Sequence, residues 1–297
     1  MKTKADILCI GSVLWDVIGR SSVVMRVGSD VPGRITRVPG GVAMNIAMTL
    51  TRFGMTPTLL TAIGRDNEGE ELVGECQRMG ILTDHVYRSE DLPTDTYMAV
   101  EGANGLIAAI ADAHSLEQAG DKILRPLSNG ALGTTEAPYA GPVALDGNLT
   151  VDLLRDIAVS PLFAAADLRV APASPGKADR LLALLGHPSA TLYVNLEEAG
   201  LLCRQTFATS EDGARGLIAR GAKRVLVTDG GKSASEATGD SVLTQTPPQV
   251  LVTRVTGAGD TFMAAHIAAE HAGADREEAL HRALSAAATY VSGELPR

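Results

Sequence analysis

The sequence predicts an α/β protein in which a mostly parallel sheet lies between two layers of helices. Short β-rich runs alternate with helical patterns along the 297 residues, as in βαβ units. Hydrophobic residues make up 45% and aromatic residues only 3%, so the core must consist mainly of Ala, Leu, Val and Ile. Such residues suit parallel strands that are buried on both faces. We therefore expect a three-layer α/β/α core in a single domain that spans residues 1–297.

Each layer can be assigned to segments. The expected core strands are residues 7–10, 58–63, 142–145, 168–170, 191–194 and 224–228. The expected helices between and after them are residues 43–53, 68–79, 150–158, 178–185, 212–219 and about 263–271.

A smaller group of strands interrupts this alternation. Residues 15–20 and 34–38 form one pair without a helix between them. Residues 96–101 and 106–110 flank Asn104-Gly105, a strong hairpin signal because both residues tolerate positive φ. We expect these strands to leave the main sheet as a small lid, formed by segments of about 12–38 and 95–112.

Composition excludes several classes of protein. The formal net charge of −9 argues against nucleic acid as a partner. No apolar run is long enough to span a membrane, and the first residues read as a strand rather than a signal peptide. Cys9, Cys76 and Cys203 are far apart and form no CxxC pair, which favours a reducing, cytoplasmic setting.

The most informative segment runs from Val255 to Phe262 and contains Gly257-Ala258-Gly259-Asp260 before an apolar helix. The glycines allow a tight turn that directs several backbone N–H groups to one point, and the start of a helix adds the positive end of its dipole. This arrangement suits a transferring phosphoryl group, and Asp260 is positioned to accept a proton from an attacking hydroxyl. The alternative is a plain strand–helix turn with Asp260 as an N-cap.

A second glycine-rich segment lies near the N-terminus. Gly40-Gly41 precede a helical pattern and allow a ligand to approach the backbone closely, while the amide of Asn45 can bind a polyol hydroxyl. The alternative is a loop followed by an ordinary asparagine at the start of a helix.

Taken together, the Gly-Gly-x-x-x-Asn-x-Ala and Thr-Gly-Ala-Gly-Asp-Thr-Phe segments resemble the ribokinase-like (PfkB) family of carbohydrate and nucleoside kinases. Asn195-Leu196-Glu197-Glu198 matches the family's Asn-x-x-Glu motif, and Thr228-Asp229-Gly230 its nucleotide loop. Asp16 aligns with the acidic residue that holds substrate hydroxyls. The resemblance covers almost the whole chain.

The resemblance implies transfer of the ATP γ-phosphoryl group to a hydroxymethyl oxygen, with Mg²⁺ as cofactor. It implies that Asp260 is the base and that the amides of Gly257, Ala258 and Gly259 hold the phosphoryl oxygens. Glu198 would act on Mg²⁺ through water. The remaining implied contacts are those to the substrate (Asp16, Gly40, Gly41 and Asn45) and those to ATP (Asn195, Thr228 and Gly230).

Read alone, these motifs have ordinary structural explanations. Asn195 and Glu198 can cap a helix, Asp229-Gly230-Gly231 can form a hairpin turn, and Asp16 can be a solvated charge at a strand edge.

Three positions depart from the family pattern. Arg254 replaces an acidic residue of the usual monovalent-cation site, so we do not expect K⁺ to bind in the usual way; Arg254 either supplies a fixed positive charge or points to solvent. Ser233 replaces the second glycine of the nucleotide loop. Ala264-Ala265 replace a glycine shortly after the catalytic segment, which is a minor change because alanine also packs closely.

The substrate is less clear from the residues than the reaction. The stretch from Thr96 through the Asn-Gly turn to Asp112 and the strand end Asp146-Gly147-Asn148 resemble those of pseudouridine kinases. We therefore expect phosphorylation of pseudouridine at its 5′-hydroxyl, with Thr96, Asp112 and Asn148 as substrate contacts.

Other substrates and classes remain open. The nearest alternative is a kinase of a free sugar such as ribose, fructose or 2-keto-3-deoxygluconate. An alternative of another class is a catalytically silent sugar-binding or regulatory protein. The apolar strands of the lid would gain from being covered, so we expect a homodimer formed through the lid.

Overall fold

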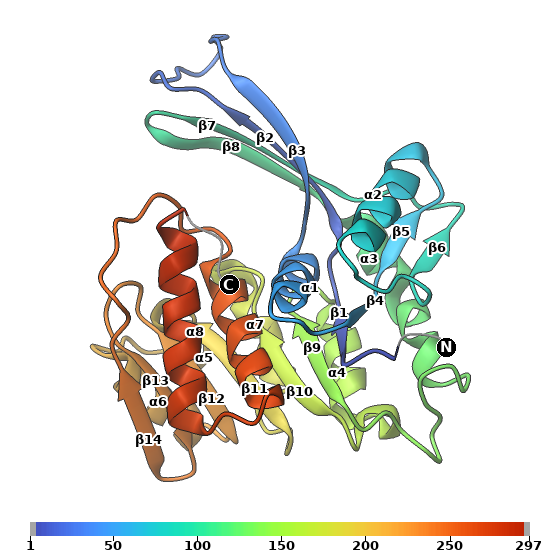
Figure 1. Cartoon of the computed structure of the whole chain (residues 1–297), viewed down its shortest axis with the longest axis vertical. Helices are drawn as coiled ribbons and strands as arrows, with labels where there is room; N and C mark the ends of the chain where they lie inside the picture. Colours follow the sequence, from blue (N-terminus) through green and yellow to red (C-terminus); the bar gives the residue numbers. More distant parts are fainter. Residues whose placement is uncertain (1–3, 294–297) are drawn as a thin grey trace.

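The computed structural model describes residues 4–293 of the chain. Within this range, eight strands form the main sheet in the order β14-β13-β12-β11-β10-β9-β1-β4 (Figure 1). Their bounds are β1 Ile7–Ile10, β4 Pro57–Leu60, β9 Pro142–Asp146, β10 Asp167–Ala171, β11 Ala190–Asn195, β12 Arg224–Thr228, β13 Ala234–Thr238 and β14 Ser241–Gln245. Neighbouring strands from β4 to β12 are parallel, and β13 and β14 add an antiparallel edge.

The helices cover both faces of this sheet. They are α1 Val42–Arg52, α2 Asn67–Arg78, α3 His114–Ala119, α4 Val151–Val159, α5 Leu196–Cys203, α6 Ser210–Ala219, α7 Ala258–His271 and α8 Arg276–Val291, with 3₁₀ segments η1 Gly120–Leu127, η2 Pro161–Phe163 and η3 Pro175–Ala183. Helices α1, α2, α7 and α8 pack on one face, and α3, α4, α5 and α6 on the other. The side chains of β1 alternate between the two faces. Ile7 and Cys9 pack against α1, α2, α7 and α8, and Leu8 and Ile10 pack against the helices of the other face. The three-layer α/β/α core is confirmed.

The lid strands form a sheet of their own, which projects from the core in Figure 1. Its order is β3-β2-β7-β8, with β2 at Leu14–Arg20, β3 at Arg34–Gly40, β7 at Thr96–Gly102 and β8 at Gly105–Asp112. We call these strands the lid sheet. Strand β2 is parallel to β7, while β2–β3 and β7–β8 are antiparallel. The division of the chain into one domain and an inserted lid remains a prediction.

Some elements differ from the sequence-based expectation. The strand expected at 58–63 is divided into β4 and β5 Ala62–Gly64, and β5 pairs with β6 Tyr87–Ser89 rather than with the main sheet. The helix expected at 178–185 is the 3₁₀ segment η3, which starts at Pro175. The catalytic-segment helix starts earlier than residue 263, at Ala258. Polar strands β13 and β14 had no apolar run that would reveal them.

A cluster of charged side chains fixes the far half of α7 against the sheet. Arg169 of β10 pairs with Asp167 and with Glu270 of α7. Arg224 of β12 donates to Glu270 at 2.6 Å and to Glu236 of β13 at 2.8 Å. We call the following set the α7 charge cluster: Asp167, Arg169, Arg224, Glu236, Glu270 and Arg276.

Candidate active site

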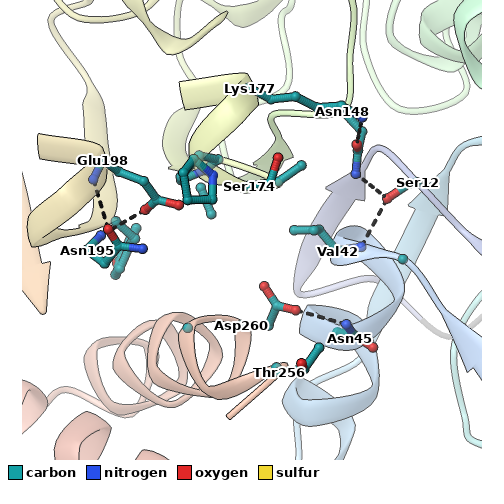
Figure 2. Close-up of a pocket in the computed structure, with 18 of the residues that line it drawn as sticks. Ser12, Val42, Asn45, Asn148, Ser174, Lys177, Asn195, Glu198, Thr256 and Asp260 are labelled. Atoms are coloured by element: carbon teal, nitrogen blue, oxygen red, sulfur yellow. Dashed lines mark hydrogen bonds between the residues drawn. The ribbon is translucent and has the colours of Figure 1, made fainter. Parts of the chain in front are cut away.

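A cavity of about 610 Å³ opens at the carboxyl ends of the parallel strands, beneath the lid sheet. This is the edge at which open α/β sheets bind ligands, and the volume is in the usual range for small-molecule pockets. Its walls come from the ends of strands β1, β9, β11 and β12, from the starts of α1 and α7, and from the lid strands. Figure 2 shows the polar side chains that face one another across it.

The loop before α7 has a conformation that only glycine adopts readily. Gly257 has φ of 87°, and a Cβ there would lie 2.5 Å from the hydroxyl of Tyr290. That hydroxyl donates to the carbonyl oxygen of Thr256 at 2.9 Å, which ties helix α8 to the loop. The N–H of Ala258 donates to Val255 O at 3.0 Å, whereas those of Gly257 and Gly259 make no hydrogen bond within residues 4–293. The loop therefore presents unpaired backbone donors at the positive end of α7.

Asp260 lies in the first turn of α7 and faces α1 across the pocket (Figure 2). Its carboxylate accepts a hydrogen bond of 2.9 Å from the Asn45 amide. Burial is the main cause that raises the pKa of Asp260, the Asn45 bond opposes it, and the negative charges of Asp146, Glu198 and Asp16 add to it, so the pKa lies at about 7. The alternative role of Asp260 as an N-cap is wrong, because Gly257 occupies that position.

Asp16 approaches the pocket from β2. A Cβ at Gly40 would lie 2.1–2.7 Å from the atoms of its carboxyl group, so glycine at 40 is required for the close pairing of β2 with β3. Burial raises the pKa of Asp16 to about 6. Its carboxylate makes no hydrogen bond or ion pair with other residues of the described range, and it is therefore available to a ligand.

Strand register decides which lid residues face the cavity. Asp16 is paired with Tyr97, and Tyr97 with Ala111, so these three side chains share one face of the lid sheet, and all three line the pocket. The adjacent row contains Trp15, Thr96 and Asp112.

That second row faces away from the cavity. The indole of Trp15 donates to the backbone of Glu68 in α2 at 2.9 Å, and Asp112 bonds to His114 at 2.9 Å. The structure therefore does not bring Thr96 and Asp112, two predicted substrate contacts, to the pocket lining, because alternate residues of a strand point to opposite faces.

Asn195 and Glu198 form a reciprocal capping box at the start of α5. Glu198 N donates to the Asn195 side chain and Asn195 N to the Glu198 side chain, both at 2.8 Å. The capping alternative is thus correct in structural terms, yet both side chains also line the pocket. Burial is the first cause that raises the pKa of Glu198, which the bond from Asn195 partly offsets.

This arrangement fits a magnesium ion that is held mainly by phosphate oxygens and water. Among residues 4–293, no group of three or more His, Cys, Asp or Glu side chains could enclose a metal. Mg²⁺ commonly binds through one or two carboxylates plus substrate phosphates rather than in an all-protein cage. The buried carboxylate of Glu198 at the pocket wall suits that mode.

The expected nucleotide loop lies between β12 and β13. Thr228 lines the pocket, while Gly230 is exposed, with φ of 56°, in the connection of this antiparallel pair. The alternative of a hairpin turn is therefore also correct.

A polar network around Asn148, one of the predicted substrate contacts, lies on the wall formed by the segments after β1, β9 and β10 (Figure 2). Asn148 donates from its amide to Ser12 Oγ at 3.0 Å and accepts from Lys177 Nζ at 2.6 Å. Ser12 Oγ in turn donates to the buried carboxylate of Asp146 at 2.5 Å and accepts from Val42 N at 3.0 Å. Ser12 carried no signal of its own, because single serines are common.

The structure brings most of the predicted site residues to one cavity. Those that line it are Asp16, Gly41, Asn45, Asn148, Asn195, Glu198, Thr228, Gly257, Gly259 and Asp260. Gly40 and Ala258 lie directly beside lining residues, whereas Thr96, Asp112 and Gly230 do not reach the lining.

Comparison with known proteins agrees with this geometry. The model of the pfkB family carbohydrate kinases matches residues 4–296. The chain is 30% identical over 264 residues to the sugar kinase YeiI of Escherichia coli (strain K12), which covers 86% of this chain and 69% of that protein. It is 28% identical over 282 residues to the pseudouridine kinase of the same organism, covering 89% of this chain and 83% of that one.

A solved structure shows the same fold. The ribokinase of Arabidopsis thaliana, complexed with ribose and ATP, superposes with a TM-score of 0.78 at 21% identity, covering 97% of this chain and 94% of that one. Within residues 4–293, no helix is both long and apolar enough to cross a membrane.

Proposed function

Because the chain belongs to the pfkB family of carbohydrate kinases, phosphotransferases that act on sugar or nucleoside hydroxyls, we propose that it phosphorylates the 5′-hydroxyl of a nucleoside, pseudouridine in the first place, with ATP as donor. The observation that carries the proposal is the pair formed by Asp260 and Asn45 beneath unpaired backbone donors. A base, an acceptor-binding amide and an anion site thus converge in one cavity.

The reaction requires positioning and charge neutralisation more than covalent chemistry. Asp16 and Asn45 hold the hydroxyls of the acceptor, and the Asp260 carboxylate takes the proton of the attacking hydroxyl. The bond between the γ-phosphorus and the bridging oxygen of ADP breaks as the new bond to the acceptor oxygen forms. The N–H groups of Gly257 and Gly259 stabilise the phosphoryl oxygens.

The nucleotide occupies the side of the pocket formed by Asn195, Glu198 and Thr228. Glu198 would hold Mg²⁺ through water, and the ion would supply positive charge against the phosphates. The raised pKa of Glu198 agrees with a carboxylate that gains a cation only in the complex.

The lid supports a nucleoside rather than a free sugar. Tyr97 is in the same row as Asp16, so an acceptor whose ribose reaches Asp16 would place its base against the Tyr97 ring. Ala111 and Ala113 leave space beside that ring. Aromatic side chains are suitable surfaces for a flat base.

Arg254 supplies the fixed positive charge that other members obtain from a monovalent cation. Its guanidinium lies 3.8 Å from the centre of the Tyr290 ring, and its Nε donates to Tyr290 O at 2.8 Å. The side chain is therefore held beside the Thr256–Gly257 loop rather than free in solvent. We expect K⁺ to change activity by less than about twofold, since no acidic partner for K⁺ remains at this position.

We also propose that two copies of the chain pair through their lid sheets. Strand β8 is an edge strand within the described residues, and Leu106 and Ile110 on it are 60% and 67% exposed. An exposed apolar edge of this kind is a template for pairing.

The experiment that tests the function is turnover of ATP with a panel of acceptors. It contains pseudouridine, uridine, adenosine, ribose, fructose and 2-keto-3-deoxygluconate, each with Mg²⁺ and with or without K⁺. Turnover confined to pseudouridine supports the proposal. Turnover of a free sugar would be consistent with the proposed mechanism but would refute pseudouridine as the substrate. Absence of turnover with every acceptor would favour a binding protein with a kinase fold.

A further inference from the structure

The pocket wall follows the order of the strands in the sheet. Thr228 ends β12, Glu198 follows β11, Lys177 follows β10, Asn148 follows β9 and Ser12 follows β1. On the proposed function, the nucleotide lies toward β11 and β12 and the acceptor toward β1. Lys177 therefore follows the central strand of this set, and its side chain reaches along the wall to Asn148 (Figure 2).

The charges of the pocket make this lysine distinctive. The lining contains the carboxylates of Asp16, Glu198 and Asp260, and Lys177 is its single basic side chain among the described residues. ATP brings further negative charge into this space. A cation in the same pocket opposes the repulsion between these groups.

The ammonium group is held in place without being neutralised. Its partner is the neutral amide oxygen of Asn148 at 2.6 Å, and Lys177 forms no ion pair within residues 4–293. The side-chain amide of Asn148 cannot rotate easily. Its nitrogen donates to Ser12 at 3.0 Å and to Asp146 at 3.3 Å, and the backbone N–H of the same residue donates to Asp146 at 2.8 Å. Two donors of the ammonium group remain for a ligand.

From this position we propose that Lys177 is a catalytic residue that donates a hydrogen bond to a non-bridging oxygen of the γ-phosphoryl group while it is transferred. Asn148 is a positioning residue that fixes the lysine through its amide oxygen. The reaction remains balanced as written above: the phosphorus exchanges the ADP oxygen for the acceptor oxygen, Asp260 takes the acceptor proton, and Lys177 keeps all of its protons.

The decisive variants are Lys177→Met, which keeps the length of the side chain and removes its charge, and Lys177→Arg, which keeps the charge. Lys223→Met is the matched control, because Lys223 is exposed at the opposite end of β12. With the best acceptor of the panel, we expect Lys177→Met to lower kcat roughly 10²–10³-fold, as loss of one donor to a transition-state anion does. Lys177→Arg should recover at least about tenfold of that loss, and Lys223→Met should change kcat less than about twofold.

A binding experiment locates the contact. Lys177→Met should weaken binding of a non-hydrolysable ATP analogue about tenfold while leaving ADP binding within about twofold, because only the former has the γ-phosphoryl group. Equal weakening of both nucleotides, or a rise confined to the KM of the acceptor, would overturn the proposal. Asn148→Ala should lower kcat less than Lys177→Met does, and a larger fall would also contradict it.

These readouts separate the two proposals. If the wild-type protein phosphorylates no acceptor, the proposed function fails, and the comparison of ATP analogue with ADP still decides the role of Lys177. Thermal unfolding of each variant checks that it is folded.

Discussion

Helix α7 carries two acidic side chains in opposite surroundings. Asp260, in its first turn, has an amide as its hydrogen-bond partner and the carboxylates of Asp16 and Glu198 in the same pocket. Glu270, near its other end, lies between Arg169 and Arg224. Burial raises the pKa of both groups, but the arginines reverse the outcome for Glu270, whose pKa is lowered, whereas that of Asp260 rises to about 7.

The contrast extends to the neighbours of each residue. Burial would raise the pKa of Glu236, yet His266, Arg224 and Arg276 lower it to about 2, while Asp16 in the pocket is raised to about 6. A carboxylate balanced by arginine stays ionised and holds structure, and one left among other carboxylates exchanges a proton near neutral pH. One helix thus has a reactive end and an anchored end.

The largest effect is expected at the reactive end. Asp260→Asn removes the base and keeps the shape of the side chain, so kcat should fall roughly 10²–10⁴-fold. The melting temperature should stay the same or rise, because a poorly solvated charge is removed. Steady-state kinetics and thermal unfolding measure the two. An Asp260→Asn protein that loses stability but keeps its activity would contradict the assignment of Asp260 to the reactive end of α7.

The next effect is expected at the anchored end. Glu236→Gln removes the carboxylate that Arg224 and Arg276 share, while Arg224 keeps its bond to Glu270, and removing one charge from such a buried arrangement costs about 3–5 kcal/mol in the free energy of unfolding. Activity per folded molecule should change little, because no member of the cluster itself lines the pocket.

Urea unfolding compares this variant with Glu211→Gln, which breaks an exposed pair with Arg215 that is worth about 0.5 kcal/mol or less. If Glu236→Gln raised the activation free energy, calculated from kcat, by more than it lowered the free energy of unfolding, the division of α7 into two ends would be wrong.

The smallest expected effect concerns the pH dependence of kcat/KM. Asp260 acts as a base only when ionised, and its pKa is raised to about 7, so activity should rise with pH through neutrality. At pH 6, kcat/KM should be roughly one tenth of its plateau.

Asp16→Asn removes a negative neighbour and should shift this acidic limb to lower pH, although the limb belongs to the coupled carboxylates together. Glu236→Gln serves as the control and should leave the limb in place. A limb that shifts in both variants, or in neither, would contradict the assignment.

Local signals explain why much of this molecule could be predicted from its sequence. The apolar run of β1 predicts a buried strand, and the Gly-Ala-Gly-Asp segment predicts a turn before a helix, each from only a few residues. The ordered motifs also placed Asp16, Asn45 and Asp260 in one site, and the structure brings them together.

Long-range pairing explains what was missed. Arg169 in β10 looks like an exposed strand residue until Glu270, far along the chain, is placed beside it. The contact between Lys177 and Asn148, which joins η3 to the end of β9, likewise follows only from the fold. Thr96 was expected at the substrate in place of Tyr97, because only the register of β7 against β2 decides which of the two faces the pocket.

The bond from Tyr290 to Thr256 also bears on how the protein is made. A chain that grows from its amino end acquires Ser12, Asp16 and Asn45 early, but the hydroxyl that occupies the space beside Gly257 arrives only with helix α8. The loop that is proposed to hold the phosphate is therefore complete only once helix α8 has been added and packed. Competence to consume ATP would then mark the completed molecule.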